Sequence, residues 1–560
     1  MSVNYAQQFS RRSTPQQQPI PGSNQVANSA GGYSWEVTPW QRMERFLILG
    51  AEGGTYYISQ QSLIQQNHES VRMCIKENGP KTVETITNIS LAGRAPKNDP
   101  AIFALALCVV YGDPDTKRLA LDSVSKVCRI GTHLFHFVQY FNAMGKWGRS
   151  VRRAIADWYN KRDANKLAMQ VIKYQQRDGV SHRDVLRLAH ATPATQQHEA
   201  VFRYVVAGPD ALGDRTVKGA DKQSSRSYKP VARLPEVIEA KERLAKTPTV
   251  DEAVKLIHDF DLPREVIPTQ LLNEIKVWDA LLQKMPLTAM IRNLNKMTSI
   301  GLIKPLSEAA KLVKQRLGDQ TMLRKARIHP LSVLIANRIY ASGRGDKGSL
   351  TWTPVPAILQ ALDEAFYKTF ENAVPTGKPL LFGLDVSGSM SSPMAGTCIS
   401  CCEGTAALSL IHASIEPEVH VMGFADRFVD LGIRKGMTLG EATDRAQRNN
   451  FGSTDCSLAI EWAAQNKVKA GGIIIMTDSE TGSYQYSDQR HPSQAMQSYR
   501  SKFVPDARLV VIGMTSNSFT INDPKDPLGL DVVGFDTSVP AVVSDFIRGR
   551  PEPASPEEVE

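Results

Sequence analysis

One carboxylate and two hydroxyls are spaced closely enough in this chain to hold a metal ion. Asp385, Ser387 and Ser389 occupy every second position directly after the apolar run 380–384. On a turn, side chains with this spacing converge on one point and offer hard oxygen ligands, which suit Mg²⁺ or Mn²⁺ better than zinc. Because two of the three are hydroxyls, coordination positions remain for water or for an acidic group of a partner.

Two later segments supply oxygen ligands of the same kind. Thr454 precedes a helix-like run, and Asp478 ends a second apolar run over 472–477. If both apolar runs are parallel strands of a doubly wound sheet, their carboxyl ends form one crevice in which Asp385, Thr454 and Asp478 can meet. Three segments in this order favour a metal site. The alternative is a formed site that never takes up an ion.

The elements that would position these ligands alternate between strand and helix. Apolar runs predict strands near 380–385, 418–424, 472–478, 508–514 and 531–535, with helical segments between them. This order is typical of a doubly wound α/β domain, which we place at 373–548. The last residues, 549–560, form an acidic tail with nothing to pack.

Upstream of residue 373 the sequence predicts helices that follow one another with no strands between them. We predict a succession of amphipathic helices from Thr38 to Val205, which includes separate helices at 59–66, 70–78 and 80–92, and further helices at 234–315, 330–342 and 354–370. This pattern favours an α-solenoid of HEAT-like repeats over 33–372. Residues 1–32, rich in Gln, Ser and Pro, are predicted to be a disordered tail, and 208–230 a mobile basic loop.

Composition and charge restrict the class of protein. The 560 residues are 42% hydrophobic and 22% charged, as in soluble multidomain proteins. The longest apolar run is too short for a bilayer, and we recognise no signal peptide, so we expect a cytoplasmic protein without membrane contact. Residues 379–548 hold 13 Lys and Arg against 19 Asp and Glu, net −6, and the tail is −3. The whole chain is +9, which leaves +18 on residues 1–378, a field that attracts polyanions such as nucleic acid.

The cysteines and histidines are weaker indicators of a metal site. The seven cysteines are scattered, and Cys398, Cys401 and Cys402 lack a second pair for zinc, so buried free thiols are predicted. His133 and His136 lie in an apolar helix without a nearby third ligand, which is more typical of core histidines than of a metal site.

The most basic stretch of the helical body is 141–190, with eleven Lys and Arg against four Asp. A helix predicted over 164–177 would place three of the cations on one side. Arginines just upstream could clamp phosphates, and His190 could stack on a base or donate a hydrogen bond. The alternative is a solvated basic face. The candidate RNA-binding residues are Arg149, Arg152, Arg153, Lys166, Lys173, Arg177 and His190.

The metal-site positions and several longer sequence blocks resemble known protein families. The five metal-site positions resemble the metal-ion-dependent adhesion site of von Willebrand factor A domains. Six further blocks resemble the Ro ribonucleoprotein family, which joins a TROVE domain to a von Willebrand A domain: HLFHFVQY, KWGRSVRRAIADWYN, KYQQRDGVSHRDVLRLAH, MPLTAMIRNLNKMTS, RIHPLSVLIA and ALDEAFYKTFENAVPTGKPLLFGLDVSGSM. The resemblance covers about residues 35–547. It departs from the family in the 208–230 loop, the N-terminal tail and the short connection before Trp147.

The resemblance implies a closed ring of HEAT-like helices that binds small noncoding Y RNAs on its outer surface. It also implies that single-stranded 3′ ends of misfolded RNAs enter a central hole, in RNA quality control. The family's Y-RNA contacts correspond to Lys173, Arg177 and His190. Mg²⁺, or Mn²⁺ in its place, would be held by three hydroxyls, with Asp385 and Asp478 acting mainly through bridging waters. An exoribonuclease or another protein could dock on the A domain of the monomer.

We therefore expect a binding protein and not an enzyme. No nucleophile and base pair stands out, and no GxxxxGK[ST] phosphate loop occurs in the sequence. Two other classes remain open. One is a metal-dependent adaptor that binds proteins through a peptide-binding solenoid, and the other is a Mg²⁺ nuclease.

Overall fold

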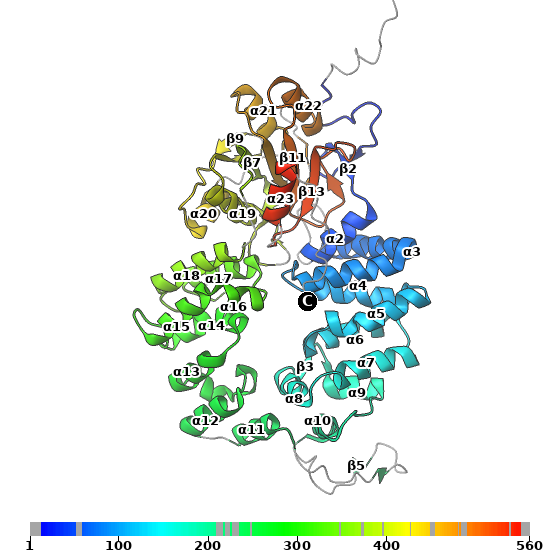
Figure 1. The fold of residues 1–560 in the computed structure, drawn as a ribbon, viewed down its shortest axis with the longest axis vertical. Coiled ribbons are helices and arrows are strands. Elements are labelled where there is room, and N and C mark those ends of the chain that lie inside the picture. The colour runs from blue at the N-terminus through cyan, green and yellow to red at the C-terminus, as the bar shows by residue number, and fades with distance from the viewer. Residues whose placement is uncertain are drawn as a thin grey trace, which may run out of the picture.

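The computed structural model describes residues 13–549 except 52–58, 209–216, 219–224, 227–233, 247–248, 346–348, 371–374, 395–396, 426, 449–453, 480, 483–489 and 537–538. Two arms of helices extend from an α/β domain, which is at the top of Figure 1. Within the described ranges, no helix is long and apolar enough to cross a membrane.

The first arm runs from the N-terminal side of the α/β domain to the far end of the molecule. Its helices stack in successive layers, as Figure 1 shows. They are α2 (Pro39–Leu49), α3 (Gln60–Ala92), α4 (Asp99–Tyr111), α5 (Pro114–Val127), α6 (Gly131–Met144), α7 (Arg149–Asn160), α8 (Ala164–Lys173), α9 (His182–Ala189) and α10 (Gln196–Ala207).

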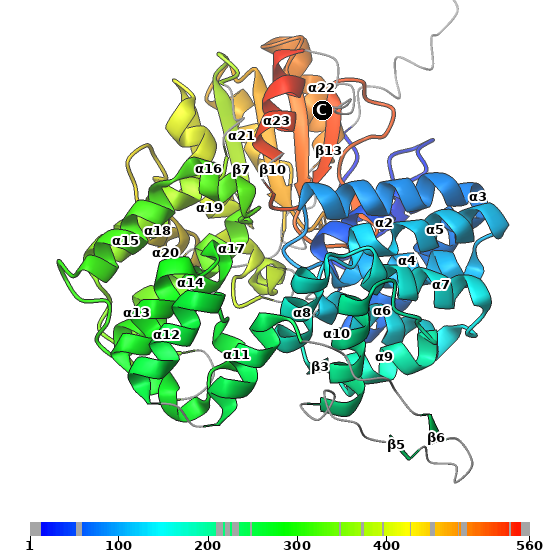
Figure 2. The ribbon, with the colours of Figure 1, turned by 60° about the horizontal axis from the view of Figure 1, so that its bottom comes forward.

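The second arm returns to the α/β domain. Its helices are α11 (Glu236–Ala245), α12 (Val250–Phe260), α13 (Ile275–Lys284), α14 (Leu287–Ser299), α15 (Glu308–Gly318), α16 (Gln320–Lys325), α17 (Pro330–Ser342) and α18 (Pro356–Lys368), with 3₁₀ turns η2 (Arg264–Val266) and η3 (Thr269–Asn273). At the far end α11 packs against α8, which joins the arms (Figure 2). At the near end α2 contacts β13 and α17 contacts α20 of the α/β domain. The predicted helical-repeat ring is confirmed.

The α/β domain is a six-stranded sheet in the order β13-β11-β10-β7-β8-β9, parallel except for β9. Its strands are β7 (Leu380–Asp385), β8 (Val419–Phe424), β9 (Phe428–Asp430), β10 (Gly472–Thr477), β11 (Arg508–Gly513) and β13 (Gly529–Val533). Its helical elements are η4 (Gly388–Ser391), α19 (Cys401–Ile415), α20 (Leu439–Arg448), α21 (Leu458–Gln465), α22 (Pro492–Lys502) and α23 (Val539–Arg548). The predicted doubly wound fold is confirmed.

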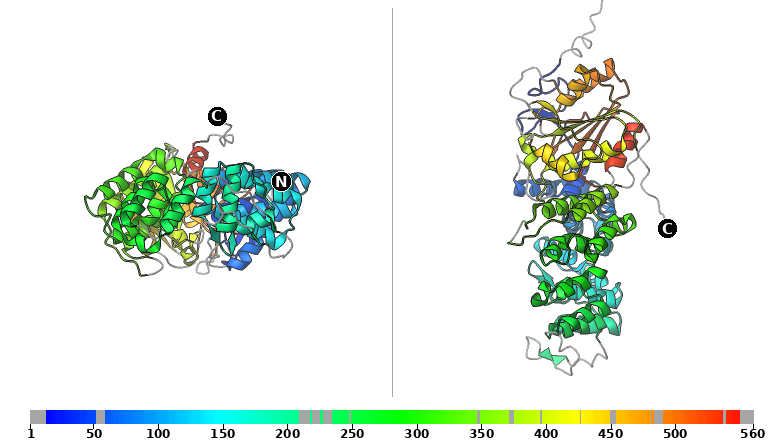
Figure 3. Two further views of the ribbon diagram at one scale, coloured as in Figure 1. Left: turned by 90° about the horizontal axis from the view of Figure 1, so that it is seen from below. Right: turned by 90° about the vertical axis from the view of Figure 1, so that its left-hand side faces the viewer.

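Both faces of this sheet are buried, which is why its strands are continuous apolar runs. Alternate residues of β10 enter different cores: Ile474 and Met476 pack with α19 and α23, while Ile473 and Ile475 pack with α21 and α22. Figure 3 shows the sheet between these layers of helices. The fold thereby brings the carboxyl ends of β7 and β10 side by side at one edge.

The prediction of a disordered tail over 1–32 is wrong for residues 13–32, while 1–12 lie outside the described residues. β1 (Val26–Ala27) pairs with β2 (Tyr33–Glu36), and β2 pairs with β12 (Phe519–Thr520) of the α/β domain. The segment is held by buried polar side chains such as Gln16, which is fully buried, and not by an apolar stripe. Hydrophobic patterning cannot detect such an interaction.

Three other predictions change in detail. The predicted helices at 59–66 and 70–78 form one helix that begins at Gln60, whereas the predicted break before 80–92 is present as a kink within α3 at Asn78, whose φ of −155° is non-helical. The loop predicted over 208–230 and the acidic tail over 549–560 lie mostly outside the described residues; within the loop, β5 (Val217–Lys218) pairs with β6 (Ser225–Arg226). All seven cysteines are free, and each is buried except Cys398.

Candidate nucleic-acid interface and metal site

The loop after β7 brings the first three predicted ligands together. Asp385 ends β7, and its Oδ1 accepts hydrogen bonds from the Ser387 backbone N–H (3.0 Å) and hydroxyl (2.5 Å). The Ser387 and Ser389 hydroxyl oxygens are 3.0 Å apart. On the other side, Thr477 at the end of β10 donates to Asp385 Oδ2 at 2.6 Å. The predicted convergence of these oxygens is therefore present.

The other two predicted ligands lie at the same edge of the sheet. Asp478 directly follows β10, the neighbour of β7. Thr454 is carried by a loop fixed at both sides, because the Asp455 N–H donates to Ala425 after β8 and the Gly482 N–H donates to Thr454. All five predicted ligand residues are at most 3% exposed. A cation held there would be largely enclosed by protein.

The oxygens available fit a hard divalent cation. The Thr454 hydroxyl is buried, and the part of the chain described here offers it no hydrogen-bond partner. An uncompensated buried hydroxyl is costly, and a bound cation would satisfy it. Within the described residues no group of three or more His, Cys, Asp or Glu forms a metal site. The donor set is thus two carboxylates and three hydroxyls, which suits Mg²⁺ or Mn²⁺.

Protons should compete with the cation at Asp385. Burial raises the pKa of this carboxyl to about 6, although hydrogen bonds from Ser387 and Thr477 oppose the shift. The carboxyl is therefore mostly protonated below pH 6 and ionised above it. We expect Mn²⁺ to bind about tenfold more weakly at pH 5 than at pH 7, as titration calorimetry can measure. Asp385→Asn should bind weakly at both pH values, and equal wild-type affinity at pH 5 and 7 would contradict this assignment.

The seven predicted RNA contacts are mostly on the surface of the first arm. Five of them are exposed: Arg149 and Arg153 on α7, Lys166 on α8, Arg177, and His190 at the end of α9. Arg152 and Lys173 are half-buried. Lys173 lines a cavity of about 240 Å³ at the junction of the two arms, where Asp261, Lys284 and Asn293 of the second arm also lie.

The prediction that Arg177 continues helix α8 is wrong. The helix ends at Lys173, and β3 (Gln176–Arg177) pairs with β4 (Val180–Ser181) in a tight hairpin. Asp178 and Gly179 form its turn with φ of 49° and 80°. Positive φ at both positions is what a two-residue hairpin turn requires, and Asp-Gly is its usual sequence. Arg177 thus extends from a hairpin, 60% exposed.

A histidine fixes this hairpin to the arm. His136 on α6 contacts Asp178 through Nε2 (3.1 Å) and Asp99 of α4 through Nδ1 (2.5 Å), and the two carboxylates raise its pKa. Burial instead lowers the pKa of His133 to about 4. Both histidines are half-buried on α6, so the prediction of core histidines is only partly correct, and His136 is in addition an ion-pair residue.

Two arginines outside the predicted set of RNA contacts add to the exposed basic surface of the first arm. Arg183 and Arg187 are exposed on α9 at the spacing i, i+4 that places side chains on one helix face, and His190 is exposed at the C-cap, where its φ of 48° is left-handed. The opposite face of α9 is buried, and its first residue, His182, is held by the Tyr159 hydroxyl at 2.9 Å. The spacing was visible in the sequence. We call Arg177, Arg183, Arg187 and His190 the α9 basic face.

Comparison with known proteins shows that both parts of the chain match known domain families. Residues 26–378 match the model of the TROVE domain, and residues 380–547 match that of the Ro60 vWA domain. A protein of Caenorhabditis elegans named RNA-binding protein RO60 is 35% identical, over 96% of this chain and 92% of its own. A protein of the same name from Deinococcus radiodurans is 36% identical, over 94% and 96%. The names of these relatives describe binding proteins and not enzymes, as the sequence predicts.

A solved structure is similar as well. The crystal structure of the Deinococcus radiodurans RO (RSR) protein has a TM-score of 0.67 and 36% sequence identity to this chain. The match covers 91% of this chain and all of that one. The resemblance noted in the sequence is thus confirmed in both domains.

Proposed function

The chain belongs to the Ro60 family, and on that basis we propose that it binds a small, Y-like noncoding RNA through a basic outer surface. The observation that carries the proposal is the α9 basic face, where Arg183 and Arg187 share one exposed helix face, with His190 exposed at the C-cap and Arg177 exposed on the preceding hairpin. Arginine contacts phosphates bidentately, and each phosphate neutralised releases counterions. Affinity should therefore fall steeply with salt, with RNA shape selecting the ligand more than base sequence.

We further propose that the space between the arms receives single-stranded 3′ ends of misfolded RNA, in a quality-control role. A cavity of about 300 Å³ supports this step, because it is lined from three parts of the molecule. Lys97 comes from the first arm, Arg292 and Asn295 from α14 of the second arm, and Thr397 from the α/β domain. Cationic and amide groups beside apolar Ile291 and Ile335 suit a nucleotide, whose phosphate is charged and whose base is flat and largely apolar.

The metal site completes the proposal. Ser387, Ser389 and Thr454 would hold Mg²⁺ directly, with Asp385 and Asp478 acting mainly through bridging waters. The cation would supply positive charge that fixes three loops of the α/β domain and an open position for a carboxylate. An exoribonuclease or another protein could then dock on this domain.

The 3′-end step is tested by comparing one structured RNA with and without a single-stranded 3′ tail. Wild type should bind the tailed RNA about tenfold more tightly. Arg292→Gln should remove most of that difference and leave the tail-less RNA unaffected, because Arg292 lines the cavity between the arms and not the α9 basic face. Lys311→Gln, an exposed cation on α15, serves as the matched control. Equal wild-type affinity for both RNAs would contradict the 3′-end proposal.

The same samples test the nuclease alternative. Incubation with Mg²⁺ should leave the RNA at its original length on a denaturing gel. Shortening that stops in Asp385→Ala would replace the binding proposal with a nuclease.

A further inference from the structure

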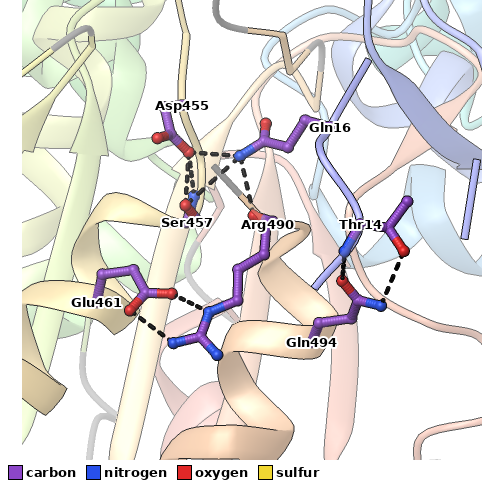
Figure 4. Close-up of polar contacts among 7 residues, drawn as sticks. All are labelled: Thr14, Gln16, Asp455, Ser457, Glu461, Arg490 and Gln494. Atoms are coloured by element: carbon purple, nitrogen blue, oxygen red, sulfur yellow. Dashed lines mark hydrogen bonds and ion pairs between the residues drawn. The ribbon is translucent and has the colours of Figure 1, made fainter. Parts of the chain in front are cut away.

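The N-terminal segment 13–36, which we call the strap, crosses the α/β domain next to the metal site. Figure 4 shows its first residues, Thr14 and Gln16, among side chains of that domain. Thr14 is anchored to Gln494 on α22 by its backbone N–H (2.9 Å) and its hydroxyl (3.3 Å). Further along, β2 of the strap pairs with β12. The strap is therefore docked at both ends.

Gln16 joins the two loops that carry Thr454 and Asp478. Its Nε2 donates to Asp455 Oδ1 at 2.6 Å, and its Oε1 accepts from the Thr481 hydroxyl at 2.5 Å. Asp455 is the neighbour of Thr454, and Thr481 lies three residues after Asp478. Gln16 is fully buried, so both hydrogen bonds are shielded from water. Gln16 thus adds two side-chain hydrogen bonds between these segments to the backbone bond from the Gly482 N–H to Thr454.

The surroundings of Gln16 are also fixed. Its Nε2 lies 3.2 Å from the Arg490 carbonyl oxygen, and the Arg490 guanidinium forms an ion pair with Glu461 on α21 (Figure 4). Asp455 Oδ1 in turn accepts from the Ser457 N–H (2.9 Å) and hydroxyl (2.7 Å). The amide of Gln16 consequently sits in a polar network in which Asp455 Oδ2 alone is buried without a hydrogen-bond partner among the described residues.

The rest of the strap holds the loop after β10 by close backbone contact. Asn28 Nδ2 donates to the Thr481 carbonyl at 2.7 Å, and the Ser34 hydroxyl donates to the Ser479 carbonyl at 3.3 Å. A Cβ atom on Gly32 would lie only 2.0 Å from the Thr481 carbonyl oxygen. Only glycine allows this approach, so the strap and the loop after Asp478 fit against each other at backbone distance.

We propose that the docked strap supports the loops of the metal site, with Gln16 as the residue that positions them. Strap docking and cation binding therefore stabilise each other. The inference rests on the cation site proposed above. Undocking would remove the two Gln16 hydrogen bonds and leave the Thr454 and Asp478 loops joined by the backbone bond between Gly482 and Thr454, so the loops would hold the cation less tightly. By thermodynamic reciprocity the cation must stabilise the docked strap by the same factor.

The test measures Mn²⁺ affinity of the full-length protein by titration calorimetry. Gln16→Met keeps the size of the side chain and removes its hydrogen bonds, and it should bind Mn²⁺ about tenfold more weakly. Gln494→Ala is the matched control, since it loses strap hydrogen bonds but touches neither metal loop, and it should stay within about threefold of wild type. Equal affinity of Gln16→Met and wild type would overturn the inference.

A second test of the coupling measures hydrogen exchange and requires no mutation in the strap. Mg²⁺ should slow amide hydrogen exchange about tenfold in residues 13–36 of wild type and leave it unchanged in Ser387→Ala. Unaltered exchange in wild type saturated with Mg²⁺ would also overturn the inference. A wild type that binds no Mn²⁺ would instead reject the cation site itself, and the coupling with it.

Discussion

Replacing Arg183 and Arg187 together with glutamine should weaken binding of a structured RNA by about ten- to a hundredfold at low salt. Both side chains are exposed on the same face of α9, so they can reach phosphates without rearrangement. Each lost phosphate contact should also reduce the slope of log affinity against log salt by about one. A gel-shift titration at several salt concentrations measures both quantities.

The double variant should not disturb the fold. Glutamine and arginine have similar helix propensity, and the buried face of α9, formed by His182, Val185, Leu186 and Ala189, is untouched. The control is Lys311→Gln/Lys314→Gln on α15, which removes the same charge from an exposed helix face of the other arm. If both double variants lose affinity equally, net charge and not the α9 basic face governs binding.

Replacing Arg45 with methionine should destabilise the protein by about 3 kcal/mol, because the side chain is buried and joins the arm to the α/β domain. Arg45 lies on α2 and is 2% exposed. Its guanidinium donates to the carbonyl oxygens of Asn517 (3.3 Å) and Phe519 (2.7 Å) and faces the half-buried carboxylate of Asp531. Methionine would remove both hydrogen bonds and the positive charge opposite Asp531.

Arg42, one turn earlier on the same helix, provides the control for this variant. It is only half-buried and donates to Gln66 at 2.6 Å, so Arg42→Met should cost less than about 1 kcal/mol. Urea denaturation followed by circular dichroism would compare the two variants. Similar midpoints for Arg45→Met and wild type would show that α2 and the α/β domain are held together by apolar packing alone.

The convergence of the candidate metal ligands was predictable because it follows from sheet topology. Apolar runs that end in Asp385 and Asp478 must be strands buried on both faces, and the carboxyl ends of neighbouring parallel strands meet at one edge. Nothing beyond residue type and order was needed to place these ligands together. The detailed hydrogen bonding was not accessible in this way, since it depends on loop conformations such as that around Thr454.

The basic surface was only partly predictable. Helical spacing suggested Lys166, Lys173 and Arg177 as one stripe, but the Asp-Gly turn after Arg177 ends the helix early and turns the chain back. Local turn chemistry outweighed helical periodicity there. The pair Arg183 and Arg187 was equally regular on the helix predicted at 182–190, yet it was not singled out.

The strap was missed for a different reason. Sequence patterns detect segments that bury apolar side chains, whereas this segment is held by amides such as Gln16 and Asn28 in a polar network. Their partners, Asp455 and Thr481, lie more than 400 residues away in the chain. The low-complexity composition of the strap therefore led to a prediction of disorder, although the strap is ordered.

The most direct test of RNA binding is a titration of the wild-type protein with a structured RNA carrying a single-stranded 3′ tail, at two salt concentrations. We expect tight binding at low salt and a loss of at least about tenfold on a fourfold increase in salt, because several phosphates are neutralised. No binding at low salt would contradict this expectation. The metal-dependent protein adaptor would then become the better description of the chain.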